Sequence, residues 1–298
     1  ALPILIAGTL ALFIALEPAF VVYSRTMLPD TFLLVFEFSA ISLLLFAIQD
    51  SAKTRQRTLI FLSALLLGCA LSIKWTALGV MFAVTIFLLI KKEYTNAIFS
   101  LVTTGVVYML TFALFFVFYF PNGGKVTTTL PAYDVPVIAE TEFPVSPSLK
   151  DAILFIPKWH EVIQETNHMD EISNQLLPAP HPITWITADK STVIPFWLNS
   201  DGGMILLHGN TLLWTTLFFL FIFFITQRAV NMFIHKQWVF APNELFLIVG
   251  YIASYVPFFL IDRPMYLYHY FTPLLFLLLL SPVATSELLR CISLITKK

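Results

Sequence analysis

Two short charged segments lie between apolar runs of this chain, and both contain residue types that can bind an anion. The first contains Arg25 and Asp30, and the second contains Arg263 and His269. Arginine binds phosphate through paired hydrogen bonds, and Lys74, at the end of another apolar run, would bind it as a point charge. Charged groups beside a bilayer are costly, so they usually mark a functional site or a structural ion pair. The residue types therefore favour a lipid-linked anionic substrate.

Several of these residues have a catalytic and a structural interpretation. A carboxylate such as Asp30 or Glu17 could accept a proton from an acceptor hydroxyl, and His269 could bind phosphate or relay a proton. Equally, Arg25 could pair with Asp30 as a structural ion pair, and Lys74 could extend its ammonium group from a helix end to the membrane surface. The sequence leaves both interpretations open for each residue.

Composition places these residues in a membrane protein. Of the 298 residues, 58% are hydrophobic and only 12% are charged, which predicts an all-α polytopic membrane protein. The net charge of −1 argues against nucleic acid as a partner. His160, His168 and His181 lack the spacing of metal ligands, so we expect no metal or other cofactor. The chain opens in an apolar run without the features of a signal peptide, and we expect the natural N-terminus to lie before Ala1.

The apolar runs predict eight membrane-spanning helices, since a bilayer core needs about 20 apolar residues per helix. They cover residues 2–18, 31–48, 58–74, 76–90, 96–120, 206–226, 244–261 and 269–289. The third and fourth runs would together span about 50 Å as one helix, which is too long for a single crossing. We therefore predict a tight hairpin at Trp75.

The basic residues of the short loops predict the orientation. If the loop containing Lys53, Arg55 and Arg57 lies inside, ten of the seventeen Lys and Arg residues fall on the inner side. With this orientation, seven ionisable residues lie at outer ends of spans: Glu17, Arg25, Asp30, Lys74, Asp262, Arg263 and His269. Glu37 is the only acid well inside an apolar run. Opposite charges from at least four helix ends then meet at one depth, which is typical of a binding cavity at the outer membrane interface.

A long outer loop, residues 121–205, divides the transmembrane helices of residues 1–120 from those of residues 206–298. Apolar residues recur at helical spacing within 150–175, which predicts an amphipathic helix in the plane of the interface. Two tryptophans near its end, Trp185 and Trp197, could stack on a sugar of the acceptor or anchor the loop at the interface.

Four segments resemble those of the protein O-mannosyltransferases, in the same order along the chain. Residues 23–30 (YSRTMLPD) resemble the family's serine-arginine, methionine-leucine-aspartate segment, and residues 74–78 (KWTAL) its lysine-tryptophan-threonine-glycine segment. The third segment, with HPITW and PFW, is similar to the tryptophan-rich end of the family's last outer loop. The fourth, residues 262–273 (DRPMYLYHYFTP), is similar to its C-terminal leucine-tyrosine-histidine-tyrosine segment. Pro29 is an insertion relative to the family pattern, and Ala77 replaces its glycine.

The resemblance implies a GT-C-type helical bundle that transfers mannose from polyprenyl-phosphate-mannose to Ser or Thr of an exported protein. It implies a multi-pass enzyme of a prokaryotic plasma membrane, with its active site on the extracytoplasmic side and with membrane lipids and the export machinery as further partners. The leaving phosphate would be bound by Arg25, Arg263, Lys74 and His269. Asp30 would support catalysis, because the family's catalytic aspartate-glutamate pair would lie before Ala1.

Three other functions remain open at this point. One is another polyprenyl-phosphate-sugar transferase that acts on lipid or glycan, similar to the lipid A aminoarabinose transferases. A second is a transporter, which would place polar residues at the midplane of broken helices, where Glu37 is the chief candidate. A third is an inactive subunit that lacks the catalytic acid.

Overall fold

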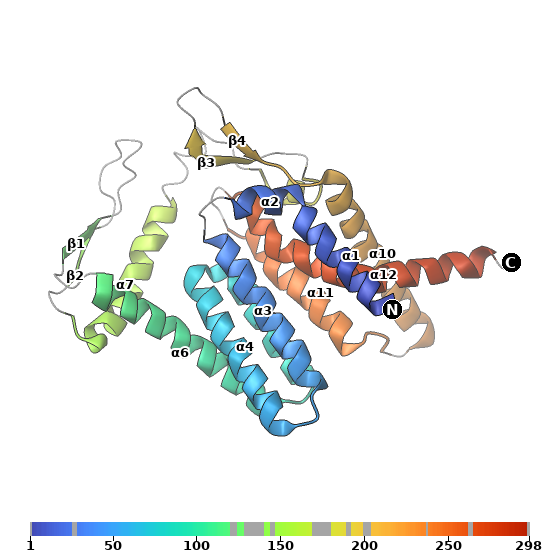
Figure 1. Ribbon diagram of the computed structural model, residues 1–298, viewed down its shortest axis with the longest axis horizontal. Coiled ribbons are helices and arrows are strands. Elements are labelled where there is room, and N and C mark those ends of the chain that lie inside the picture. Colours follow the sequence, from blue (N-terminus) through green and yellow to red (C-terminus); the bar gives the residue numbers. More distant parts are fainter. Residues whose placement is uncertain are drawn as a thin grey trace.

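The computed structural model describes residues 2–25, 29–119, 124–127, 140–143, 147–168, 180–188, 192–198, 204–236, 238–261 and 265–296. The helices are α1 (Leu2–Leu16), α2 (Pro18–Ser24), α3 (Asp30–Gln49), α4 (Lys53–Ile73), α5 (Leu78–Ile90), α6 (Tyr94–Tyr119), α7 (Leu149–His168), α9 (Pro182–Trp185), α10 (Thr211–His235), α11 (Pro242–Tyr255) and α12 (Phe271–Thr296). Short 3₁₀ turns precede or follow some of them: η1 (Trp75–Ala77), η3 (Val256–Phe259) and η4 (Leu267–Tyr270). Figure 1 shows a helical bundle from which α6 and α7 extend to one side.

All eight predicted spans correspond to helices, but fewer than eight are long enough to cross a membrane alone. Among the described residues, α3, α4, α6, α10 and the segment Leu267–Leu294 have the necessary length and apolar composition, and the bent pair of α1 and α2 would be a sixth. The helices α5 and α11 are shorter, with 13 and 14 residues. They pack on each other, so neighbouring helices cover much of their surface in place of lipid. The chain is a multi-pass, helical membrane protein, as its composition predicts.

The first span is broken at Glu17, where α1 and α2 meet at an angle of 59°. Proline lacks an N–H and has a fixed φ, so Pro18 ends the hydrogen bonding of α1 and is well suited to the first position of α2. The Glu17 carboxylate caps the new helix by accepting hydrogen bonds from the N–H groups of Ala19 (2.6 Å) and Phe20 (3.1 Å). The bend directs the end of α2 toward the start of α3.

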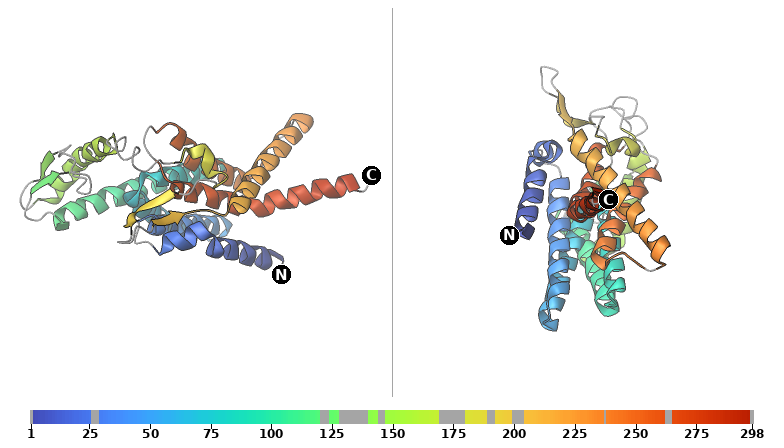
Figure 2. Two further views of the ribbon diagram at one scale, coloured as in Figure 1. Left: turned by 90° about the horizontal axis from the view of Figure 1, so that it is seen from above. Right: turned by 90° about the vertical axis from the view of Figure 1, so that its right-hand side faces the viewer.

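A second break separates α4 from α5 at Lys74, as predicted. Lys74 is extended (φ −158°, ψ 137°), and the 3₁₀ turn η1 follows it directly. The two helices do not form a closely packed hairpin, however. The chain leaves α4 after Lys74, so α5 packs mainly on α11, while α4 packs between α3 and α6. A second group is formed by α10, α11 and α12, in which α12 packs on both other helices. Figure 2 shows that α10 and the C-terminal end of α12 point away from each other.

The described residues of the long loop include two helices that contact the bundle, α7 and the short α9, and two antiparallel strand pairs. The predicted amphipathic helix is α7, whose Phe155 and Ile156 pack on Phe116 of α6. Ser148 begins it, and hydrogen bonds from the Ser148 hydroxyl and N–H lower the pKa of Asp151 in its first turn. The strands were not predicted: β1 (Gly124–Thr127) pairs antiparallel with β2 (Glu140–Phe143), and β3 (Thr192–Leu198) with β4 (Met204–Leu207).

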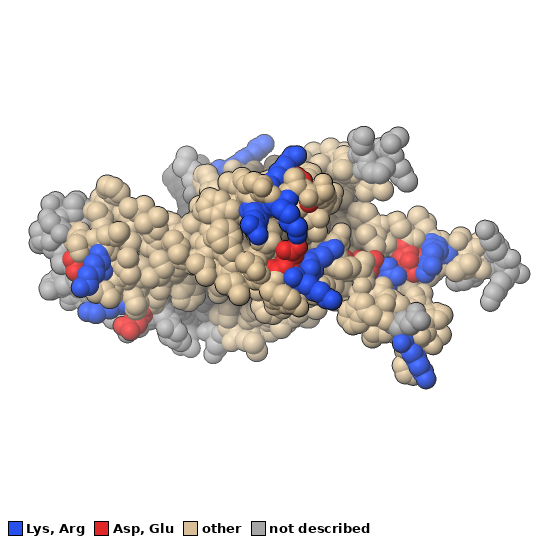
Figure 3. Space-filling model, turned by 90° about the horizontal axis from the view of Figure 1, so that it is seen from below, with Lys and Arg blue, Asp and Glu red and all other residues tan. Residues whose placement is uncertain are grey.

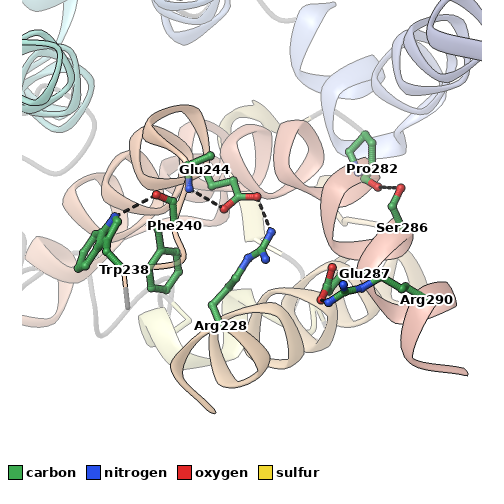
Figure 4. A network of polar contacts seen from close by, with 9 residues as sticks. Arg228, Trp238, Phe240, Glu244, Pro282, Ser286, Glu287 and Arg290 are labelled. Atoms are coloured by element: carbon green, nitrogen blue, oxygen red, sulfur yellow. Dashed lines mark hydrogen bonds and ion pairs between the residues drawn. The ribbon is translucent and has the colours of Figure 1, made fainter. Parts of the chain in front are cut away.

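Charged side chains gather at the end of the bundle where α3 joins α4, which Figure 3 views directly. There Asp50 pairs with the exposed Arg55 (3.1 Å). Ion pairs also occur toward this end of the second helix group. Arg228 of α10 donates a hydrogen bond to Glu244 of α11 (2.6 Å), and Arg290 pairs with Glu287 within α12 (Figure 4). These residues belong to the side that the sequence assigns to the cytoplasm.

The packing of α5 on α11 depends on the absence of a side chain at Gly79. A Cβ atom at this position would lie 2.8 Å from the carbonyl oxygen of Ala253 and 2.8 Å from the Cα of Ser254. Because these are backbone atoms, the helices would have to separate, and we expect Gly79→Ala to destabilise the protein by about 1–3 kcal/mol. Thermal unfolding in detergent would measure this. The control is Gly105→Ala in α6, where a Cβ meets nothing within 4 Å; equal melting temperatures for the two variants would contradict the prediction.

Candidate active site

The candidate site is centred on Asp30, a buried residue at the start of α3. Its Oδ1 accepts a hydrogen bond from Lys74 Nζ (2.7 Å), and its Oδ2 accepts one from the Tyr23 hydroxyl (2.8 Å). Three helix ends supply these groups: the end of α2, the start of α3 and the residue after α4. The sequence places Asp30 and Lys74 at the same side of the membrane, and α3 and α4 are neighbours in the structure whose connected ends lie at the opposite side.

Tyr268, which belongs to the fourth of the segments that resemble the family, also contacts Lys74. The ammonium group lies 4.5 Å from the centre of the Tyr268 ring, a distance at which the ring face attracts a cation. Tyr268 also lies beside Tyr23, with ring centres 5.3 Å apart, and Tyr23 contacts Phe271 edge to face at 5.3 Å. The carboxylate and the two tyrosines therefore hold one ammonium group at the end of the bundle opposite to the basic loops.

His269 follows Tyr268 and is buried between two aromatic rings. Its ring is stacked on Tyr268 (4.6 Å between centres) and lies nearly parallel to Trp185 (6.1 Å, 13°). Its Nδ1 lies 2.9 Å from the carbonyl oxygen of Tyr266. This arrangement joins α9, which carries Trp185, to the turn η4, and the Tyr255 hydroxyl strengthens it by donating to the carbonyl of Pro182 (2.8 Å).

The structure gives three predicted site residues partners that the sequence did not predict. Asp30 was expected to orient the acceptor or to balance Arg25; its ion pair is with Lys74, because the break after α4 places that side chain directly against the start of α3. Trp185 was expected at the interface or against the acceptor, but its indole is fully buried and donates to the carbonyl of Pro180 (3.1 Å). Glu17 was expected near an acceptor, yet it is only 1% exposed.

Glu17 has a structural role that accounts for both of its oxygens. One oxygen caps α2, and the other accepts hydrogen bonds from the N–H of Asn210 (2.8 Å) and from the indole N–H of Trp214 (2.9 Å). These two donors lie at the start of α10, so the carboxylate joins the bend between α1 and α2 to α10. An acceptor contact of Glu17 stays a prediction that no geometric feature requires.

Glu37 lies two helical turns after Asp30 on the same face of α3 and is completely buried. Its Oε2 accepts a hydrogen bond from the hydroxyl of Thr272 at the start of α12 (2.7 Å). Within the described residues, its Oε1 has no hydrogen-bond partner. Glu37 thus joins α3, which carries Asp30, to the helix that follows Tyr268 and His269.

Of the other predicted site residues, Arg25 lies near the cluster. Arg25 is exposed at the end of α2, two residues after Tyr23. Arg263 lies outside the described residues. Trp197 belongs to strand β3, and its side chain also lies outside the described part of the chain. The described residues include no group of three His, Cys, Asp or Glu side chains that could hold a metal ion.

Sequence reasoning named the charged members of the cluster but missed three hydroxyl-bearing partners: Tyr23, Tyr268 and Thr272. Tyr23 lies two residues before Arg25, Tyr268 adjoins His269, and Thr272 lies three residues after His269. A hydroxyl-bearing residue within three positions of a named ionic residue was therefore the available signal. Chemically, the cluster can present a fixed cation to an anionic group while the carboxylate holds that cation in place.

Breaking the buried pair should cost far more stability than breaking an exposed one. We expect Lys74→Met to destabilise the protein by about 3–5 kcal/mol, because Asp30 would remain buried without its counter-charge. Lys74→Met combined with Asp30→Asn should recover most of this loss. Arg55→Met is the matched control, since Arg55 is 76% exposed in its pair with Asp50 and should lose less than about 1 kcal/mol. Chemical denaturation of the detergent-solubilised protein would measure all three; similar losses for both single variants would refute the assignment.

Comparison with known proteins identifies two matching family models. Residues 158–297 match the C-terminal four TMM region of protein-O-mannosyltransferase, and residues 3–128 match the dolichyl-phosphate-mannose-protein mannosyltransferase family. No solved structure matches the chain.

Curated relatives carry the same family name. Protein O-mannosyl-transferase 1 of Danio rerio is 27% identical over 164 residues, which are 50% of this chain and 22% of the relative. The protein of that name in Rattus norvegicus is 33% identical over 115 residues, 34% of this chain and 15% of the relative. The matched parts thus span less than a quarter of these relatives. The two family models together match most of the chain, and each matched region contains residues of the candidate site. The chain therefore belongs to the protein O-mannosyltransferase family.

Proposed function

We propose that this protein transfers mannose from polyprenyl-phosphate-mannose to a Ser or Thr hydroxyl of an exported protein, on the outer face of the plasma membrane. Family membership supports the reaction class. The observation that carries the proposal is the ammonium group of Lys74, held between Asp30 and the Tyr268 ring at one end of the bundle. A fixed cation at this depth matches the phosphate of a donor whose lipid chain remains in the bilayer.

In the proposed reaction, the acceptor hydroxyl attacks the anomeric carbon of mannose. The bond between that carbon and the phosphate oxygen breaks, and polyprenyl phosphate leaves with the electron pair. Lys74 stabilises the charge that develops on the leaving phosphate, and Arg25, Arg263 and His269 contribute to binding it. Cations held in position before the reaction need no reorganisation as this charge forms.

Asp30 supports this reaction by holding Lys74. Both of its oxygens already accept hydrogen bonds, from Lys74 and from Tyr23. We propose that the proton of the acceptor hydroxyl goes to the aspartate-glutamate pair of the family's first outer loop, while Asp30 holds Lys74. This division of roles agrees with the supporting role that the family resemblance gives to Asp30.

The proposed side of the membrane follows from the distribution of charge. The site lies at the opposite end of α3 and α4 from Asp50, Lys53 and Arg55. Basic loops are retained in the cytoplasm, so this arrangement supports a site on the extracytoplasmic side.

Phosphate binding by the two arginines can be tested directly. We expect Arg25→Ala and Arg263→Ala each to lower mannosyl transfer at least tenfold, because each removes a cation from the leaving group. The assay uses reconstituted protein, polyprenyl-phosphate-mannose and a Ser/Thr-containing peptide. Arg57→Ala, exposed near the start of α4 at the other end, should retain activity. Losses below tenfold in both variants would remove these arginines from the site.

The same assay tests whether a metal takes part. Because Lys and Arg side chains supply the positive charge, we expect transfer to continue after incubation with excess EDTA. A loss of activity that returns on addition of Mg²⁺ or Mn²⁺ would contradict this. Mass spectrometry of exported proteins, with and without the gene, separates protein acceptors from lipid or glycan acceptors.

A further inference from the structure

A second polar cluster lies where the long-loop helix α7 meets the bundle. The indole Nε1 of Trp75 donates a hydrogen bond to the Tyr108 hydroxyl (3.0 Å), and this hydroxyl lies 2.5 Å from Nε2 of His160. The His160 ring also contacts Trp75 at 4.9 Å between centres and lies nearly parallel to Tyr108 (5.9 Å, 18°). Three elements therefore meet at one hydroxyl group: η1, α6 and α7.

The hydrogen bond from Trp75 leaves the Tyr108 hydrogen available for His160. Trp75 can only donate, so the Tyr108 oxygen accepts from it and can direct its own hydrogen to His160 Nε2. In this arrangement Nε2 carries no proton and the imidazole is neutral. Burial of the imidazole lowers the pKa of His160, which favours the same neutral form.

Ionisable residues lie near His160 on each of the three elements that meet there. Tyr108 faces it from α6, and Lys74 directly precedes Trp75 at η1. On α7 itself, Lys158 and Glu161 flank it, and both are exposed.

Apolar contacts also hold α7 to α6, but these contacts do not reach the candidate active site. Phe116 of α6 packs edge to face against Phe155 (5.1 Å) and Trp159 (5.6 Å) of α7. The hydrogen bonds of His160 and Tyr108 extend further, to Trp75 of η1. They thereby connect α7 to the residue that directly follows Lys74, the cation held by Asp30.

We propose that the hydrogen-bonded chain of Trp75, Tyr108 and His160 positions α7 against the connection that carries Lys74, and so sets the affinity for the protein acceptor. The inference rests on the proposed function for its acceptor. These three residues are positioning residues, since they contact one another and not the reacting atoms. The long loop would thereby be held in register with the phosphate-binding cation.

Substitutions that keep the rings but remove the hydrogen bonds test this proposal. In the reconstituted full protein, we expect Tyr108→Phe and Trp75→Phe to raise KM for a Ser/Thr-containing peptide at least fivefold. The kcat and the KM for polyprenyl-phosphate-mannose should stay within twofold, whereas general destabilisation would lower the active fraction. Tyr94→Phe, at the exposed start of α6, is the control and should resemble wild type.

The pH dependence provides a second readout that packing would not change. We propose that Tyr108 donates to His160, and this hydrogen bond needs a neutral imidazole, so it is present above the pKa of His160 and is lost as the pH falls through it. Peptide KM should therefore rise on acidification in wild type. His160→Gln, whose amide oxygen can accept from Tyr108 but does not titrate, should keep a low KM that is independent of pH over this range.

Hydrogen exchange separates this inference from the proposed function. Backbone amides of residues 149–168 should exchange faster in Tyr108→Phe and Trp75→Phe than in wild type or Tyr94→Phe. Faster exchange in a protein that transfers no mannose would support the positioning of α7 and overturn the proposed function. Unchanged exchange together with unchanged peptide KM in both variants would overturn the inference.

Discussion

The architecture around the candidate site depends on one buried ion pair, Asp30 with Lys74. A carboxylate away from water is stable only when its oxygens are hydrogen-bonded and its charge is balanced. Lys74 and Tyr23 each satisfy one oxygen, and Tyr268 offers its ring face to the ammonium group. The pair therefore requires four segments to end at the same place. The bend before α2 and the break after α4 are what allow it.

Two other carboxylates hold these segments in position. Glu17 joins the bend of the first span to the start of α10 through four hydrogen bonds. Glu37 joins α3 to α12 through Thr272. Both are buried, so each contributes to the geometry of the cluster and not to an exposed surface. The three acids near this end thus have different tasks: one holds the cation, and two hold the helices that present it.

Much of the framework could be predicted because apolar runs and helix-breaking residues act locally. The break near Lys74 and the end of the first apolar run at residue 18 follow from residues adjacent in the sequence, and the structure has a break after α4 and a bend at Glu17. Each of the eight predicted spans corresponds to a helix, and among the described residues five, or six with the bent pair, have the length and composition to cross a membrane alone. The helices α5 and α11 have 13 and 14 residues and pack on each other, so a neighbouring helix covers part of their surface in place of lipid. The four strands of the long loop were missed. They are short, and their pairing joins residues that local sequence patterns do not connect.

The sequence by itself determined that this is a helical membrane protein, which segments are apolar enough to enter a bilayer, and that its ionic residues gather near the ends of helices. Those properties depend on the transfer of side chains between water and lipid, which each residue undergoes on its own. Only the tertiary structure decided the partners: Lys74 and not Arg25 for Asp30, a buried stack for Trp185, and a cap for Glu17. Partner choice depends on how helices distant in the sequence pack and turn, and differences of a few ångströms there are not encoded in the spacing of residues.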